Sequence, residues 1–151
     1  MATARASITG LDALDFRRRG ETLMDKVEAA MDDALEKGER AMKDMVATRG
    51  TGKEWTRPWG RNGRTGSFPG RVDTGDMQAE IRGKVTEKTR DRVVGNLGWD
   101  EDSADYIAYQ DQGFRHVLTG QYVEGMRALR DGGEIAKNAL VSDLNDIAGS
   151  L

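Results

Sequence analysis

The chain has 151 residues, a net charge of −3 and a hydrophobic content of 37%. This length predicts one domain spanning residues 1–151. The absence of Cys excludes disulfides, thiolate metal sites and Cys nucleophiles, and the single His, His116, excludes a His-rich metal site. No apolar run is long enough for a transmembrane helix, and residues 1–9 lack the apolar segment of a secretory signal.

The first predicted element is a long amphipathic helix over residues 11–48. Apolar residues recur at spacings of three and four from Leu11 to Val46. Read without a break, this helix would be about 57 Å long, which exceeds the diameter of a small domain. We therefore expect either a bend near Gly20 or Gly38, or a helix that projects and packs on neighbouring subunits.

Four methionines of this helix fall near one stripe: Met24, Met31, Met42 and Met45. Such a stripe suits either a hydrophobic core or a groove for a partner, because Met is adaptable packing material. The core is favoured, since the stripe continues the Leu and Val pattern of the helix.

Residues 49–72 are predicted to form a long basic loop inserted between the helix and the strands that follow. The loop contains both prolines of the chain, six glycines and two of the three tryptophans. Residues 49–71 carry six Lys or Arg residues against one Glu, a net charge of +5 that leaves −8 for the rest. Such charge asymmetry indicates contact with something negative.

The region after the loop is predicted to contain a short helix and a β-hairpin. Asp73 or Thr74 can cap a helix that continues to about residue 80. Apolar residues then alternate over residues 81–85 and again over 93–97, around a polar turn. Alternation in two runs joined by such a turn predicts two antiparallel strands.

The remaining third of the chain is predicted to be mainly helical. Residues 106–109 are a short apolar segment that could add a third strand, ended by Gly113. Helical spacing then predicts a helix from residue 119, which Gly132-Gly133 should end, and a last helix over 134–148. The order of helix, strands and helices predicts an α+β fold with a long N-terminal helix, a small antiparallel sheet and C-terminal helices.

Three patterns resemble reactive sites but lack required members. The segment 50–53 reads Gly-Thr-Gly-Lys, without the earlier Gly or the following Ser or Thr of a phosphate-binding loop. The acidic run 100–105 lacks the ligand pattern of an EF-hand, so a solvated turn is favoured over a weak cation site. His116 could pair with Asp111, but no nucleophile elbow accompanies them. We therefore predict no enzyme activity, no catalytic residues, no cofactor and no metal site.

The basic loop allows three interpretations. Arg and Trp together are typical of nucleic-acid-binding segments, where Arg pairs with phosphates and Trp stacks on bases. The same residue types dominate protein–protein hot spots. A merely solvated loop is the third possibility, since long loops are often unstructured. The acidic balance of the whole chain and the lack of a groove-reading helix weaken the first interpretation.

Four segments resemble the tail-completion or head–tail joining proteins of long-tailed bacteriophages, also described as minor tail or neck proteins. Residues 8–14, Ile-Thr-Gly-Leu-Asp-Ala-Leu, resemble the opening of that family before its long helix. Residues 72–77 resemble its Pro-Val-Asp-Thr-Gly turn, with Arg71 where the family has Pro. Residues 106–113 resemble its Tyr-Ala-x-Tyr-Val-Glu-x-Gly segment, and residues 122–129 its closing apolar segment. The family-like positions are Asp73, Thr74, Gly75, Tyr106, Tyr109, Asp111 and Gly113.

The resemblance implies a structural protein of the virion, assembled in the bacterial host cytoplasm and located at the head–tail junction. Members form part of a ring stack between the capsid portal and the tail tube, through which DNA passes without sequence-specific binding. The implied partners are copies of the same chain, in a ring that the tail symmetry of such phages implies to be hexameric, and neighbouring connector, stopper, tail terminator or tail tube proteins. No membrane is implied.

A conduit should not grip DNA, which a strongly basic channel would hold through its phosphates. We therefore expect the acidic body to face the channel and the basic loop to dock on a neighbouring ring protein. The residues expected to dock are Trp55, Arg57, Trp59, Arg61 and Arg64. The alternative function is a nucleic-acid-binding module that uses the same loop, residues 49–71.

Overall fold

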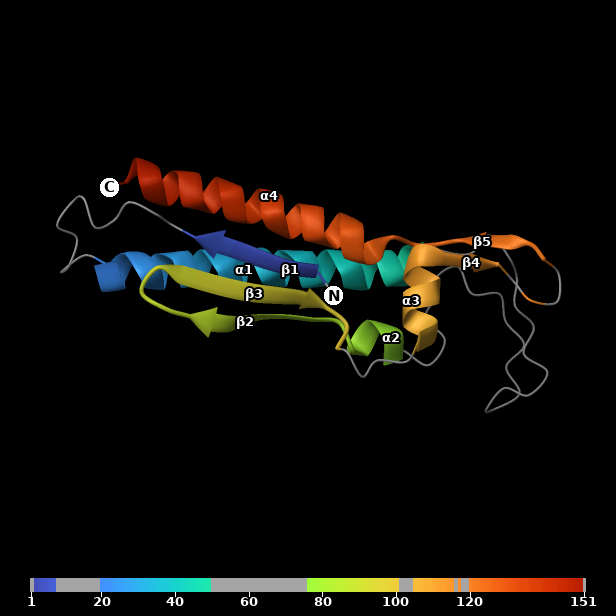
Figure 1. The fold of residues 1–151 in the computed structure, drawn as a ribbon. Coiled ribbons are helices and arrows are strands. Elements are labelled where there is room, and N and C mark those ends of the chain that lie inside the picture. The colour runs from blue at the N-terminus through green and yellow to red at the C-terminus, as the bar shows by residue number, and fades with distance from the viewer. Residues whose placement is uncertain are drawn as a thin grey trace.

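The computed structural model describes residues 2–7, 20–49, 76–100, 105–115, 117 and 120–150. Its elements in chain order are β1 (Ala2–Ser7), α1 (Gly20–Thr48), α2 (Asp76–Ala79), β2 (Arg82–Lys88), β3 (Arg92–Gly98), α3 (Asp105–Gln112), β4 (Gly113–Arg115), β5 (Tyr122–Glu124) and α4 (Ala128–Gly149). Helices and strands mix along the chain, which confirms the α+β class (Figure 1).

The helix α1 is the axis of the fold. Its 29 residues rise about 44 Å at 1.5 Å per residue. The helix is unbroken through Gly38, and it does not project, because the sheet packs on one side of it and α4 packs along another (Figure 1). An interruption of the helix at Gly38 is therefore wrong, whereas a bend near Gly20 and packing on neighbouring subunits stay predictions. Residues 11–19 of the predicted helix lie outside them.

The methionine stripe of α1 belongs to the core, as predicted. Met24, Met31 and Met42 are buried, and Met45 is half-buried against the same cluster. They pack with apolar residues of β3 and α4, such as Leu97 and Leu140.

The main sheet has three antiparallel strands in the order β1-β3-β2. The predicted hairpin is confirmed as β2 and β3. Its third strand is β1, which the sequence reading missed, and residues 106–109 instead lie in the helix α3. The predicted order is corrected accordingly, because a strand precedes the first helix. A separate two-stranded ribbon pairs β4 with β5.

Close glycine contacts bring α1 to the sheet and to α4. A Cβ on Gly95 of β3 would lie 2.6 Å from Leu35 Cδ1, and one on Gly83 of β2 would lie 2.8 Å from the Leu35 carbonyl oxygen. A Cβ on Gly38 would lie 2.6 Å from Leu97 Cδ2. These glycines lack the side chain that would hold the elements apart.

The C-terminal region differs from its prediction in two places. Residues 122–124 are strand β5, not part of a helix, and α4 runs without interruption through Gly132-Gly133. Gly132 is buried against α1, so packing outweighs the cost of about 1 kcal/mol that glycine imposes on a helix interior.

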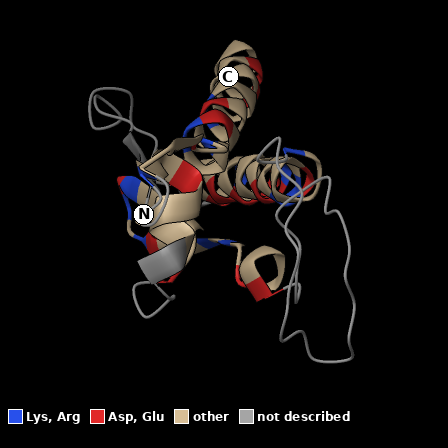
Figure 2. Cartoon of the chain, turned by 90° about the vertical axis from the view of Figure 1, so that its right-hand side faces the viewer, with Lys and Arg blue, Asp and Glu red and all other residues tan. Residues whose placement is uncertain are grey.

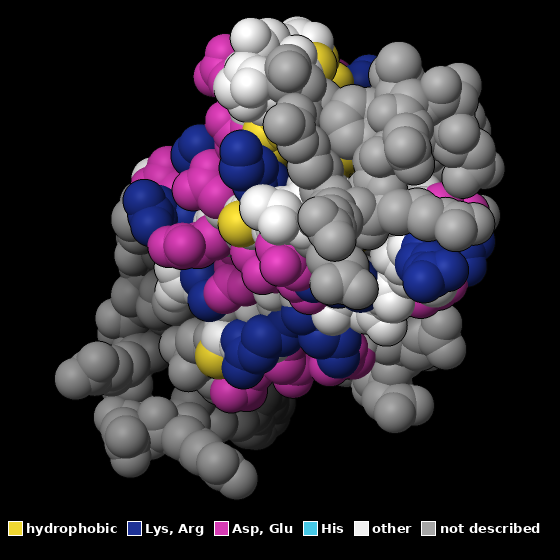
Figure 3. All heavy atoms as spheres, turned by 90° about the vertical axis from the view of Figure 1, so that its left-hand side faces the viewer, with side chains coloured by type: hydrophobic (Ala, Val, Ile, Leu, Met, Phe, Trp, Pro, Cys, Tyr) yellow, Lys and Arg dark blue, Asp and Glu magenta, His cyan; other side chains and the backbone are white. Residues whose placement is uncertain are grey.

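The surface is a mixture of both charge signs. Side chains of both signs, Asp and Glu as well as Lys and Arg, occur on α1 and α4 (Figure 2). The end of the molecule that carries the β2–β3 turn shows the same mixture, with few apolar side chains (Figure 3). There Lys88 Nζ lies 2.6 Å from both the Asp25 and the Glu28 carboxylates of α1. None of the described helices is long and apolar enough to span a bilayer.

Candidate functional site

The structure describes only part of the predicted site. The five loop residues Trp55, Arg57, Trp59, Arg61 and Arg64 lie outside the described residues, as do Asp73, Thr74, Gly75 and His116. The family-like segment 106–113 is described. Tyr106, Tyr109 and Asp111 lie on α3, and Gly113 begins β4.

Asp111 joins α3 to the start of α4. Its side chain is buried, and its Oδ1 accepts a hydrogen bond of 3.3 Å from the backbone N–H of Leu129. Its backbone carbonyl accepts another, of 2.9 Å, from the N–H of Arg127. Arg127 precedes α4 in a left-handed conformation, with φ of 55°, and its side chain makes no capping bond. Asp111 thus supplies from another helix the cap that α4 lacks locally.

Gly113 and Gly125 allow the strands after α3 to turn back against it. Gly113 has φ of +93°, a region that side chains rarely adopt. A Cβ on Gly125 would clash with the carbonyl oxygen of Asp111 and the backbone of Gln112. The Gly of the family-like segment therefore has a conformational role in the junction of α3, β4 and α4.

Arg49 is the first residue of the predicted basic loop, and its side chain contacts residues before and within α4. Its Nη1 donates to the Met126 carbonyl oxygen at 2.5 Å and lies 2.6 Å from Asp131 Oδ2. Hydrogen bonds from Arg130 and from Arg49 hold the pKa of the Asp131 carboxyl below its usual value. Arg49 therefore fixes the end of α1 to the first turn of α4 and is not free to bind a partner.

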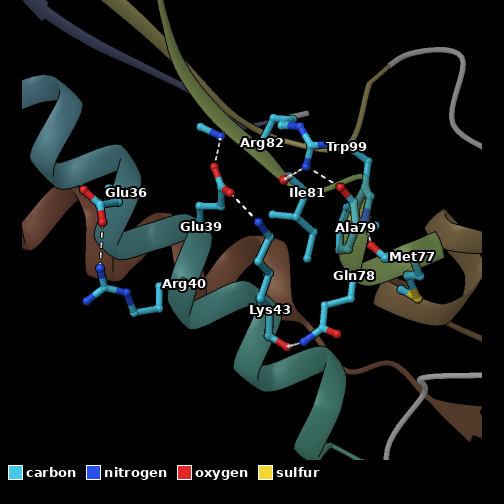
Figure 4. Close-up of polar contacts among 11 residues, drawn as sticks. Glu36, Glu39, Arg40, Lys43, Met77, Gln78, Ala79, Ile81, Arg82 and Trp99 are labelled. Atoms are coloured by element: carbon cyan, nitrogen blue, oxygen red, sulfur yellow. Dashed lines mark hydrogen bonds and ion pairs between the residues drawn. The ribbon is translucent and has the colours of Figure 1, made fainter. Parts of the chain in front are cut away.

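The helix α2 fixes the opposite end of the same segment. Gln78 Nε2 donates to the Lys43 carbonyl oxygen of α1 at 2.9 Å, and Trp99 Nε1 donates to the Met77 carbonyl oxygen at 2.7 Å (Figure 4). The residues on either side of segment 50–75 are thus held near the same end of α1. Both residues that flank the basic segment, Arg49 and Asp76, therefore lie in segments anchored to the rest of the described structure.

Side chains of α1 cover the outer edge of β2. Glu39 Oε2 accepts a 2.7 Å hydrogen bond from the Gly83 N–H, and Glu39 Oε1 accepts one of 2.5 Å from Lys43 Nζ (Figure 4). Burial alone would raise the pKa of Glu39, but these two hydrogen bonds lower it. The strand also has a bulge at Thr86. A bulge and a covered N–H both discourage pairing with another strand.

Exposed apolar side chains lie on α3, on α4 (Ile135 and Val141) and on the β4–β5 ribbon, which extends past the end of α1 (Figure 1). Tyr109 is 60% exposed, Tyr122 61% and Val117 95%. Large exposed aromatics are enriched where proteins meet, because they bury much area at little entropic cost. The ribbon is a candidate contact surface that sequence reading missed, since it placed Tyr122 on a helix.

No group of three or more His, Asp or Glu residues that could hold a metal occurs among the described residues. The acidic run 100–105 falls partly outside them, between Asp100 and Asp105. The described residues thus offer helix caps, ion pairs and contact surfaces. Comparisons of the chain with known protein families, with curated proteins and with solved structures found no match.

Proposed function

We propose that this protein is a structural subunit of the connector between head and tail of a long-tailed bacteriophage, and that it forms part of a ring through which DNA passes. The observation that carries the proposal is the role of the family-like segment. Asp111 and Gly113 connect α3, β4 and α4, so the family-like segment has a structural role in this chain. A structural role of this segment is consistent with a protein whose function is assembly. The sequence resemblance supports the head–tail junction as the place where the protein assembles.

Two candidate contact surfaces on the chain support the proposed assembly into a ring. A ring of identical subunits needs two different complementary surfaces on each copy. The β4–β5 ribbon, with Val117 and Tyr122, is one candidate surface. The basic segment 50–75, which lies in the sequence between Arg49 and α2, is proposed as the second, because its Arg and Trp residues suit contact with a neighbouring ring protein. The acidic remainder of the chain faces the channel in this proposal, because it would not grip the passing phosphates.

The first test is the assembly state of the purified protein. Size-exclusion chromatography with light scattering, followed by negative-stain electron microscopy, should show closed rings with a central opening, alone or with the neighbouring connector proteins. A protein that stays monomeric in both conditions would contradict the proposal.

The second test reverses charge in the loop. The triple variant R57E/R61E/R64E should fold as the parent does, by circular dichroism, but fail to join the neighbouring protein. A matched control, K84E/R90E/K137E, changes three exposed basic residues outside the loop and should assemble normally. Normal assembly of the loop variant would remove the docking role.

The alternative function predicts a different result for the same loop. A nucleic-acid-binding module would shift DNA or RNA in a gel at low salt, and the shift would weaken steeply as salt rises. We expect no such shift from the isolated protein.

A further inference from the structure

The β4–β5 ribbon has little support from the rest of its own chain. Each strand has three residues, and of these six residues only Val123 is buried. A two-stranded ribbon is at best marginally stable in water unless it packs against another surface. The ribbon therefore gains stability from a surface that covers its exposed side chains.

The exposed large apolar side chains of the described residues fall into two groups. Tyr109, Val117 and Tyr122 lie on α3 and on the ribbon, with Val117 between the two strands in the chain. Ile135 and Val141 lie on α4. Because one chain carries both groups, every copy presents two separate apolar surfaces to its surroundings.

Val141 of α4 lies in an uncharged stretch of the helix. Residues 138–142 read Asn-Ala-Leu-Val-Ser and carry no charge, in a chain of which 32% is charged. Asn138, Val141 and Ser142 are exposed, whereas Leu140 packs in the core. Charged residues are depleted at the centres of protein contacts, so this exposed face of α4 is suited to one.

The two surfaces differ in the sign of their charge. Residues 113–127, which include the ribbon, contain two Arg and one Glu, and both Arg115 and Arg127 are exposed. Residues 138–149, the C-terminal part of α4, contain two Asp and no Lys or Arg. Complementary charges around a contact steer the partners together and select their orientation. The ribbon therefore suits α4 better than it suits a second ribbon.

The ribbon cannot cover the exposed face of α4 in its own copy. It precedes α4 directly and extends away from that helix, past the end of α1 (Figure 1). Val141 lies about 20 Å along the helix axis from Ala128, where α4 begins. A contact between the two surfaces therefore needs two copies of the chain.

We propose that the ribbon of one copy docks on the exposed face of α4 in a second copy of this chain, with Val117 and Tyr122 against Val141 and its uncharged neighbours. The two surfaces are different, so each copy can dock on one neighbour and receive another. Such a head-to-tail contact generates a ring when the rotation between copies closes. This inference rests on the proposed ring function and names the surface that the ribbon contacts.

Two substitutions test the contact from its two sides, Val117→Glu on the ribbon and Val141→Glu on α4. Val117 is almost fully exposed, and Glu has a higher helix propensity than Val, so both variants should keep the fold by circular dichroism. Sedimentation velocity over a concentration series should show that each raises the Kd for association about tenfold or more, the scale of a residue at the centre of an interface. Ala29→Glu, on the exposed face of α1, is the matched control and should associate as the parent does.

A mixture of the two variants distinguishes this contact from a symmetric one. The Val141→Glu copy keeps a native ribbon, and the Val117→Glu copy keeps a native α4. An equal mixture should therefore form pairs of one copy of each, at a concentration where each variant alone is monomeric. Isotope labelling of one variant identifies the mixed pair by native mass spectrometry. A mixture that stays monomeric, or a variant that associates as the parent does, overturns the inference.

The same measurements separate this inference from the proposed ring function. Rings that survive both substitutions retain the ring function and reject the contact between ribbon and α4. A parent that stays monomeric at every concentration also rejects the contact. Rings formed by that parent together with neighbouring connector proteins would then retain the function, and their absence would reject it.

Discussion

A Cβ atom on Gly132 of α4 would lie 3.2 Å from the carbonyl oxygen of Gly38 on α1, and still closer to the Met42 side chain. The two helices approach here through glycine backbone, with Ala136 and Leu97 completing the contact around Gly38. Gly132-Gly133, which has a low helix propensity, thus lies inside α4 and allows this helix to pack along α1. The pair of helices and the sheet depend on this approach for their shared core.

Substitution at Gly132 should therefore reduce stability. The variant Gly132→Val forces the helices apart or displaces Met42, and overpacking of this kind costs about 1–3 kcal/mol. Urea unfolding followed by circular dichroism measures the loss. The control is Gly149→Ala in the same helix, where a Cβ meets nothing within 4 Å. Equal stabilities for the two variants would contradict the packing role of Gly132.

Loss of the Asp111 carboxylate should weaken the start of α4. The variant Asp111→Ala leaves the Leu129 N–H without its side-chain acceptor, and loss of a helix cap costs about 0.5–2 kcal/mol. Asp111→Asn keeps an oxygen at the same place and should lose less. Hydrogen exchange of the first-turn amides of α4 should rise in the Ala variant before global unfolding. Unchanged exchange at Leu129 would show that the cap does not matter.

The Arg49–Asp131 pair predicts a dependence of stability on pH. Because the pKa of Asp131 is lowered in the folded protein, the ionised carboxylate favours folding. This contribution is complete above the usual value of 3.8 and is lost as pH falls through the lower folded pKa. Asp131→Asn should reduce the free energy of unfolding by about 1 kcal/mol at pH 7, the scale of a partly exposed ion pair.

The difference between Asp131→Asn and the parent should shrink toward zero in acid. Urea titrations at a series of pH values from neutral to strongly acidic measure it. The matched control is Asp146→Asn, on an exposed position of the same helix, which should track the parent at every pH. A difference at Asp131 that persisted undiminished in strong acid would argue against the carboxylate as its source.

Removal of Glu39 should open the edge of β2. The variant Glu39→Ala leaves the Gly83 N–H unpaired by its own chain, which costs about 1–3 kcal/mol if water does not replace the acceptor. The open edge should also promote association, measured as light scattering at raised protein concentration. Glu36→Ala, whose carboxylate pairs with exposed Arg40 on the same helix, is the control. Equal scattering from the two variants would contradict the edge role.

Sequence periodicity correctly predicted the elements in which the apolar pattern extends over many residues. The apolar spacing of α1 and the alternation of β2 and β3 each extend over enough residues to separate a helix from a strand. The apolar part of α3 is too short for that distinction, so the sequence left a strand possible over residues 106–109, where the structure has a helix. The strand β1 was missed because its small residues carry no apolar alternation and its conformation depends on β3.

The sequence could predict the role of a site residue only where that role follows from the residue's own local conformation. The requirement for Gly113 has a local cause, its positive φ. The role of Asp111 does not, because its acceptor faces an N–H 18 residues later in the chain, and only the packing of α3 against α4 brings them together. Arg49 likewise looks like a loop residue until the fold places Asp131 beside it. The docking residues from Trp55 to Arg64 stay a prediction.

The covering of Gly83 by Glu39 has a consequence for how copies of this protein can accumulate. A sheet with two open edges can extend without limit, since each added copy presents a fresh edge to the next, as in fibrils. In the three-stranded sheet, one edge is the bulged strand β2, and the N–H of its Gly83 already has an acceptor. Edge-to-edge growth through β2 is therefore disfavoured. The same carboxylate that satisfies one amide thus works against open-ended polymerisation through this edge of the sheet.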